Sequence, residues 1–96
     1  MTRPSDRIRA RLKAAGQRFR ANDNIAACIE PGELAALTEE VAERVDALLQ
    51  SLVIDTENDH NTRETGARVA RMYVAEIFAG RYTPSPDLTA FPNVTS

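Results

Sequence analysis

The chain contains few of the residues that form metal sites, disulfides or thiol and imidazole chemistry. Its 96 residues include one cysteine, Cys28, one histidine, His60, and no tryptophan. A single cysteine excludes an intramolecular disulfide and a Cys-x-x-Cys metal site. A catalytic zinc ion needs about three protein ligands, and these two residues lie in separate segments without neighbouring ligands. We therefore expect Cys28 to be structural and His60 to lie at the surface.

Long apolar runs are also missing. No stretch approaches the roughly 18 apolar residues of a transmembrane helix, and no secretory leader is visible. Hydrophobic residues make up 43% and charged residues 27% of the chain, which is ordinary for a soluble globular protein. These features predict one small domain without a membrane partner and favour a cytoplasmic location.

No nucleotide-binding glycine motif, P-loop or nucleophile elbow occurs. Cys28 and His60 are residue types found in nucleophile–base pairs, but no spacing signature supports such a pair in this sequence. Arg63, Arg68 and Arg71 could meet an anion at a helix start, but surface ion pairing is the commoner role of such arginines.

An acidic loop raises the question of a calcium site. Asp55, Glu57 and Asp59 alternate like the first three ligands of an EF-hand. The sixth position needs glycine and holds His60, and the twelfth needs glutamate and holds Gly66. The pattern better fits a solvated loop before a helix, where acidic residues favour the helix dipole.

Charge is distributed unevenly along the chain. Residues 1–20 carry seven basic residues and one acidic residue, whereas residues 21–96 have a net charge of −8, giving −2 overall. A basic arm could bind nucleic acid. Because no aromatic stacking set or nucleic-acid motif accompanies the charge, we favour an arm that docks on acids of its own or a neighbouring subunit.

The spacing of apolar residues predicts three helices. The first covers about 5–19, with Ser5 as N-cap and an interior weakened by Gly16. The second covers about 32–52, with Pro31 suited to its first turn and Glu40 paired with Arg44 on its surface. Its apolar seam needs a partner helix and consists of Leu34, Leu37, Val41, Val45, Leu48 and Leu52.

The third helix covers about 65–79, with Thr65 as its cap and Gly80 as the glycine that ends it. Its apolar residues cover most of its circumference, which predicts a helix buried on several sides. Two short helices cannot cover that much apolar surface. Three prolines follow, Pro84, Pro86 and Pro92, so the sequence predicts an extended tail in which Leu88 to Phe91 could form a short edge strand.

A long segment then resembles a known family. The stretch "LVIDTENDHNTRETGARVARMYVAEIFAGRY", followed by "LTAFPN", is similar to the N-terminal part of GTP cyclohydrolase I, and the resemblance covers residues 34–93. "ANDNIA" resembles the leader of a bacterial branch. The family run "DT-x-N-D-x-x-T-x-x-T-P-x-R-V-A-x-M-Y", then "E-x-F-x-G", matches Asp55, Thr56, Asn58, Asp59, Thr62, Thr65, Arg68, Val69, Ala70, Met72, Tyr73, Glu76, Phe78 and Gly80.

One position departs from the family pattern. The family usually has proline after the capping threonine, and this chain has Gly66. Proline at the first helical position is preorganised, whereas glycine loses backbone entropy. We therefore expect a slightly less stable helix start and no change of function.

The resemblance implies a fold and an activity that extend beyond this chain. The family joins an N-terminal helical part to a catalytic domain of the tunnelling fold, whose zinc is held by two cysteines and one histidine. Zinc-activated water opens the guanine imidazole ring of GTP, releasing formate and leading to 7,8-dihydroneopterin triphosphate for folate and pterin synthesis. The corresponding residues would follow Ser96, so no catalytic, cofactor-binding or metal-ligating residue is assigned here.

The sequence therefore predicts a mainly α fold with amphipathic helices at about 5–19, 32–52 and 65–79. Residues 1–31 form a basic arm and turn, 32–80 a helical domain, and 81–96 an extended tail that would start the tunnelling-fold sheet. We expect an N-terminal part of GTP cyclohydrolase I, inactive by itself, with a homo-oligomer or a missing catalytic half as partner. The alternative is a helical oligomerisation or regulatory module that assembles with a full-length enzyme.

Overall fold

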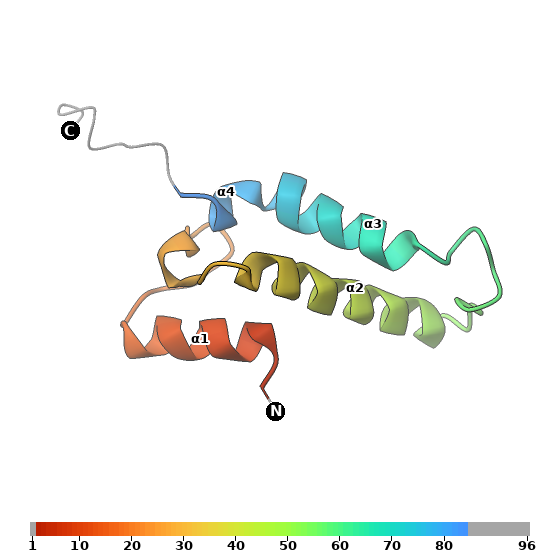
Figure 1. The fold of residues 1–96 in the computed structure, drawn as a ribbon, viewed down its shortest axis with the longest axis horizontal. Coiled ribbons are helices and arrows are strands. Elements are labelled where there is room, and N and C mark those ends of the chain that lie inside the picture. Colours follow the sequence, from red (N-terminus) through yellow and green to blue (C-terminus); the bar gives the residue numbers. More distant parts are fainter. Residues whose placement is uncertain (1, 85–96) are drawn as a thin grey trace.

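The computed structural model describes residues 2–84, and every regular element in this part of the chain is helical (Figure 1). The mainly α prediction is therefore confirmed at this level. The elements in chain order are α1 (Pro4–Ala14), the 3-10 turn η1 (Ala26–Cys28), α2 (Glu33–Ser51), α3 (Thr65–Met72), the π turn η2 (Tyr73–Ile77) and α4 (Ala79–Tyr82). The prolines Pro86 and Pro92 and the strand expected at Leu88 to Phe91 lie outside the described residues.

Helix α2 occupies the centre of the fold. Figure 1 shows α3 running antiparallel along one side of α2, and α1 lying along the other. The bounds of α2 agree with the predicted 32–52 within one residue. Gly32 is its N-cap residue and has a left-handed φ of 79°, a conformation that glycine adopts without steric cost. Pro31 precedes this cap, so it lies outside the helix rather than in its first turn.

Helix α1 is shorter than predicted. Arg3 is the N-cap residue, and Pro4 takes the first helical position instead of Ser5 capping the helix. The helix ends at Ala14 because Gly16 turns left-handed, with φ 65°. The Gly16 amide donates to the Lys13 carbonyl and the Gln17 amide to the Leu12 carbonyl, which is the Schellman pattern. Gly16 therefore ends the helix rather than weakening its interior.

The third predicted helix continues beyond its expected end. Thr65 is the first helical residue and Glu64 holds the cap position, so Thr65 is not the cap. At Tyr73 the helix widens into η2, where the Phe78 amide donates to the Tyr73 carbonyl at 2.9 Å. Gly80 lies inside α4, which runs to Tyr82. The predicted stop at Gly80 is wrong, and the extended tail does not begin at Arg81.

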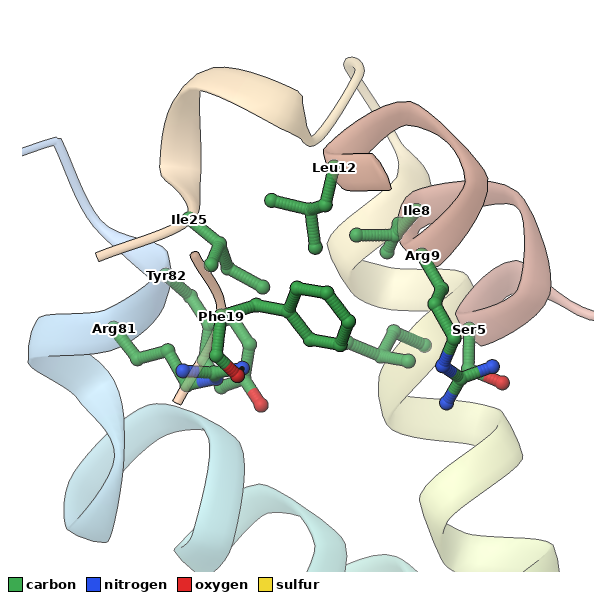
Figure 2. Close-up of a pocket in the computed structure, with 9 residues that line it drawn as sticks. Ser5, Ile8, Arg9, Leu12, Phe19, Ile25, Arg81 and Tyr82 are labelled. Atoms are coloured by element: carbon green, nitrogen blue, oxygen red, sulfur yellow. Dashed lines mark hydrogen bonds between the residues drawn. The ribbon is translucent and has the colours of Figure 1, made fainter. Parts of the chain in front are cut away.

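The apolar core joins α1, the segment after it, and α2. Four buried residues form it: Ile8, Leu12, Ile25 and Leu37. Figure 2 shows the Phe19 ring among this group, beside a pocket of about 150 Å³. Two of the residues expected in the apolar stripe of the first helix, Ile8 and Leu12, are buried. Phe19 packs on the same core although it follows the helix.

At Gly66 the backbone of α3 lies close to α2. A Cβ atom placed on it would lie 2.8 Å from the Ala42 carbonyl oxygen and 2.4 Å from Oδ1 of Asp46. The Asp46 side chain can rotate, but the carbonyl belongs to the backbone of α2. Glycine at this position therefore has a packing reason that the sequence did not show.

Substituting Gly66→Ala tests this contact. The added methyl group should force the two helices apart, and overpacking of this kind costs about 1–3 kcal/mol. Urea unfolding followed by circular dichroism measures the change. Gly80→Ala is the matched control, since nothing lies within 4 Å of a Cβ there. A Gly66→Ala variant as stable as the Gly80→Ala variant would contradict the proposed close approach.

Candidate functional site

Two buried glutamates of α2 hold α1 in place. Glu33 and Glu40 are only 6% and 8% exposed. A guanidinium nitrogen of Arg11 donates to Glu33 at 2.6 Å, and the Glu30 amide donates to it at 3.0 Å. Glu40 accepts hydrogen bonds from the Ser5 amide at 2.9 Å and from the Ser5 hydroxyl at 2.7 Å. Both ends of α1 are thus attached to the same helix.

The hydrogen bonds at Glu33 change its acidity. Donation by Arg11 is the largest cause that lowers the pKa of Glu33 from 4.5 to about 2, and burial acts in the opposite direction. Hydrogen bonds to the ionised form favour that form. Glu33 therefore remains a carboxylate at neutral pH and serves as an anchor for α1 rather than as a proton donor.

The arginines of the basic arm bind acids of the same chain, which is the docking favoured from the sequence. Two pairs lie within the arm itself, Arg18 with Asp23 at 2.8 Å and Arg9 with Asp6 at 3.2 Å. The others reach α2 or the turn before it and consist of Arg3–Glu43, Arg7–Glu33, Arg11–Glu30 and Arg11–Glu33. The arm is therefore part of the helical unit.

A second set of hydrogen bonds attaches the turn after α1 to α4. The Asn24 side chain donates to the carbonyls of Gly80 and Thr83 at 2.8 and 2.7 Å. The Ile25 amide donates to the Arg81 carbonyl at 2.8 Å. The Arg81 guanidinium donates back to the carbonyls of Phe19, Arg20 and Asp23. This contact links segments separated by more than fifty residues of sequence.

The acidic loop satisfies its own carboxylates. Asp55 accepts hydrogen bonds from the amides of Glu57 and Asn58 and from the Asn58 side chain. The Asn58 side chain is the largest cause that lowers the pKa of Asp55. Asp59 likewise accepts a bond from the Asn61 amide at 2.9 Å. Within residues 2–84 no group of three potential metal ligands is present.

Cys28 and His60 are not brought together. Cys28 ends η1, is half-buried and packs on the core. His60 is exposed in the loop between α2 and α3. These segments lie at opposite ends of α2 (Figure 1), a helix of 19 residues that spans about 28 Å. A nucleophile–base pair and a shared metal site are both incompatible with this separation.

The three arginines considered for an anion site lie in the loop before α3 and on α3 itself. Arg63 donates to the Glu57 carbonyl at 3.3 Å in the loop. Arg68 and Arg71 are exposed on α3. No carboxylate lies within 4.0 Å of any of the three in the described part of the chain.

The pocket in Figure 2 is a gap in the core rather than a site with free charged groups. Apolar core residues, Tyr82 and the polar Ser5 line it, and Arg9 and Arg81 lie at its margin. Arg9 already pairs with Asp6 at 3.2 Å, and Arg81 donates to backbone carbonyls. Neither guanidinium is available as a dedicated ligand group.

The α2–α3 hairpin instead presents one continuous apolar face. Ala42 and Asp46 of α2 face Gly66 of α3. Ala70 and Val74 are buried on the same helical arm as Gly66. In each helix, the residue that precedes one of these contacting residues points about 100° away from the contact line. Because the two helices are antiparallel, all these preceding residues lie on the same side. The face, termed the open face, consists of Val41, Val45, Val69 and Tyr73, of Leu48, Leu52 and Ile77, which continue them at helical spacing, and of Phe78, whose ring stacks on Tyr73.

The open face is exposed over much of its extent. Its five large exposed side chains retain 36–61% of their surface: Leu48, Leu52, Tyr73, Ile77 and Phe78. The rings of Tyr73 and Phe78 stack with centroids 6.2 Å apart. At roughly 200 Å² for a large side chain, the five expose on the order of 500 Å². This is about the size of the largest apolar patch on a typical monomer, and such patches are often functional.

Comparison of the chain with family models, curated proteins and solved structures found no match. None of the helices in residues 2–84 is long and apolar enough to cross a membrane. The assignment of function therefore depends on the residues and their arrangement.

Sequence reasoning missed the buried glutamates. Glu40 was expected to pair with Arg44 on the surface, and it instead accepts both polar groups of Ser5. The seam was predicted correctly as an apolar stripe, but only Leu37 of its members is buried against α1. The signal available in the sequence was an excess of basic residues in the arm, which needed acidic partners.

The Glu33 anchor predicts a specific pH dependence of stability. Its pKa is lower in the folded chain, so its contribution is fully present above pH 4.5 and is lost as the pH falls toward about 2. The urea midpoint of the chain should decrease across this window. Glu33→Gln should lower stability at pH 7 and remove part of that decrease. Glu43→Gln is the control, since Glu43 is an exposed partner of Arg3; equal effects of both substitutions would contradict the anchor.

Proposed function

We propose that this chain is the N-terminal helical region of a GTP cyclohydrolase I, acting as a scaffold and assembly element rather than as a catalyst. The open face is the observation that supports this proposal. It lies on the hairpin within residues 34–93, the segment that carries the resemblance. A helical pair with this much exposed apolar surface needs a covering surface, and the family supplies one in its sheet domain.

The polar residues of the resemblance support a scaffold role. Asp55 and Asn58 bond to each other, and Thr62 donates its amide and hydroxyl to the Asp59 carbonyl. These residues form the turn between α2 and α3. Their pattern is thus explained by loop geometry without any contact to a reacting group.

The contact between "ANDNIA" and α4 supports the same proposal. Asn24 and Ile25 of this segment bond to residues 80–83, so this leader segment is fixed to α4, the last described helix of the resembling region. The part of the arm before them is held by the glutamates of α2. A leader that is built into the helical unit is consistent with one scaffold.

The residues described here do not fit the zinc site of the family. The only cysteine and the only histidine lie at opposite ends of α2, and no cluster of three ligand residues occurs in residues 2–84. No step of the reaction is therefore assigned to this chain. The zinc ligands, the GTP-binding residues and a cytoplasmic location belong to the proposal for the longer protein.

Activity measurements test the scaffold proposal. The purified 96-residue chain, supplied with GTP and zinc, should release no formate above a blank. A full-length GTP cyclohydrolase I assayed in parallel shows that the conditions support turnover. Reading the gene past the Ser96 codon provides a second test, and a frame encoding a cysteine and paired histidines is expected. Formate release by the pure chain would overturn the scaffold role.

A second candidate function is an oligomerisation or regulatory module that joins a full-length enzyme. The exposure of Leu48 and Leu52, at 58% and 61%, favours it. Both residues belong to the predicted seam and lie beyond the stretch of α2 that α1 covers. They are free to pack against a helix of another subunit.

Size measurements separate the two candidates. If the module reading holds, the chain should co-elute with a full-length GTP cyclohydrolase I, and Leu48→Asp with Leu52→Asp should abolish co-elution because charge is not tolerated in an apolar contact. Ala47→Asp is the control on the exposed side of the same helix. Separate elution of the unmodified chain would eliminate the module reading and leave the scaffold role unaffected.

A further inference from the structure

A groove with the dimensions of a small-molecule site lies between the two arms of the hairpin. It has a volume of about 330 Å³ and separates the first half of α2 from residues 71–83. An adjoining hollow of about 290 Å³ shares Ala35, Thr38 and Arg71 with it. Ligand sites are typically hollows of about 300–1,000 Å³ with a mostly apolar lining and few polar groups. The apolar lining here consists of Leu34, Ala35, Val74, Ala75, Ala79 and Tyr82.

Arg71 and Ala75 place the groove on the side of the hairpin opposite to the open face. Each of them follows a buried residue, Ala70 or Val74, whereas Tyr73 of the open face precedes one. Successive residues of a helix are about 100° apart, so the residues before and after a buried position point to opposite sides. A ligand in the groove would therefore leave the open face uncovered.

The threonine hydroxyl groups of the lining are already used by the helices. Thr38 donates its hydroxyl proton to the Leu34 carbonyl at 2.8 Å, and Thr83 donates its hydroxyl proton to the Ala79 carbonyl at 2.8 Å. The groove therefore offers few donors for the carbonyl groups of an extended peptide, and unpaired polar groups are costly against an apolar surface. A hydrocarbon chain has no such groups to satisfy.

Arg71 supplies one positive charge where the groove and the adjoining hollow meet. Its side chain lines both, and no carboxylate in residues 2–84 lies within 4.0 Å of it. The positions three and four residues before and after it on the helix hold no acidic residue. Glu39 lines the adjoining hollow but forms no ion pair with Arg71 at that distance. A guanidinium binds a carboxylate through two parallel hydrogen bonds, so the lining favours a ligand with one carboxylate.

We propose that the groove binds a medium-chain fatty acid, with the carboxylate on Arg71 and the hydrocarbon chain along Ala75 and Ala79 toward Tyr82. The eleven positions from Arg71 to Tyr82 rise about 16 Å at helical spacing. An extended chain of ten carbon atoms is at most about 14 Å long at bond lengths near 1.5 Å, so it fits within this length. The inference does not rest on the proposed function, because the groove is formed by the described residues alone.

Titration of the full 96-residue chain with sodium decanoate, kept below its micelle concentration, tests the proposal. Amide NMR spectra should show saturable shifts of the Ala75 and Ala79 signals. Octanoate should bind more weakly, by about two- to fourfold for each methylene group removed, because less apolar surface is buried. Decanol has the same chain without the charge, and it should bind about tenfold more weakly than decanoate because it forms no charge-assisted hydrogen bond.

Three variants locate the site. Arg71→Gln should weaken decanoate binding about tenfold and leave decanol binding unchanged. Arg68→Gln is the matched control, since Arg68 is exposed on the same helix and lines neither hollow. Ala75→Phe should prevent the binding of both ligands because its ring fills the groove. Circular dichroism checks that each variant keeps its helices.

Three outcomes would overturn the proposal. The first is an equal effect of Arg71→Gln and Arg68→Gln on decanoate binding. The second is a set of shifts centred on Tyr73 and Ile77 instead of Ala75, which would place the fatty acid on the open face. The third is the absence of saturable decanoate binding to the unmodified chain, which would leave a helix of a partner protein as the occupant of the groove.

Discussion

The ionised Glu33 side chain is the interaction on which the docking of α1 depends. It is almost fully buried, and it accepts hydrogen bonds from Arg7, Arg11 and the Glu30 amide. A buried carboxylate without donors would be strongly unfavourable, so these groups and the carboxylate require one another. The core of Ile8, Leu12, Ile25 and Leu37 forms only when α1 lies against α2. The charged anchor and the apolar core are therefore two parts of one contact.

The sequence predicted the elements better than their ends and partners. The apolar spacing of α2 located that helix within one residue, because a long amphipathic pattern has a single helical interpretation. The predicted first helix ran through Gly16 to residue 19, although α1 ends at Ala14, and the predicted third helix stopped before Gly80, which lies inside α4. One glycine takes a positive φ and the other does not, and the residue type alone does not specify the backbone angle. Tertiary contacts also influence the backbone angle. At Gly80, the Asn24 side chain donates a hydrogen bond to the carbonyl.

The candidate sites were likewise predictable only in part. The absence of a motif predicted that Cys28 and His60 would not act together, and their positions at opposite ends of α2 agree with that expectation. The buried roles of Glu33 and Glu40 were not predictable, because periodicity identifies a helix face but not the polar groups of the neighbour that meets it. Gly66 shows the same limit, since its importance comes from a carbonyl on another helix.

The hairpin divides its apolar residues between three directions, and this division explains why so few of them are buried. Leu37 points to α1, Val74 points between the helices, and Leu48 and Phe78 lie on the open face. A helix flanked on two sides by short helices retains an uncovered side, since each neighbour covers only part of its circumference. Additional cover must come from a segment or chain that packs across both α2 and α3 at once. A flat surface such as a sheet meets this geometric requirement, and so does a helix that lies along the groove between α2 and α3.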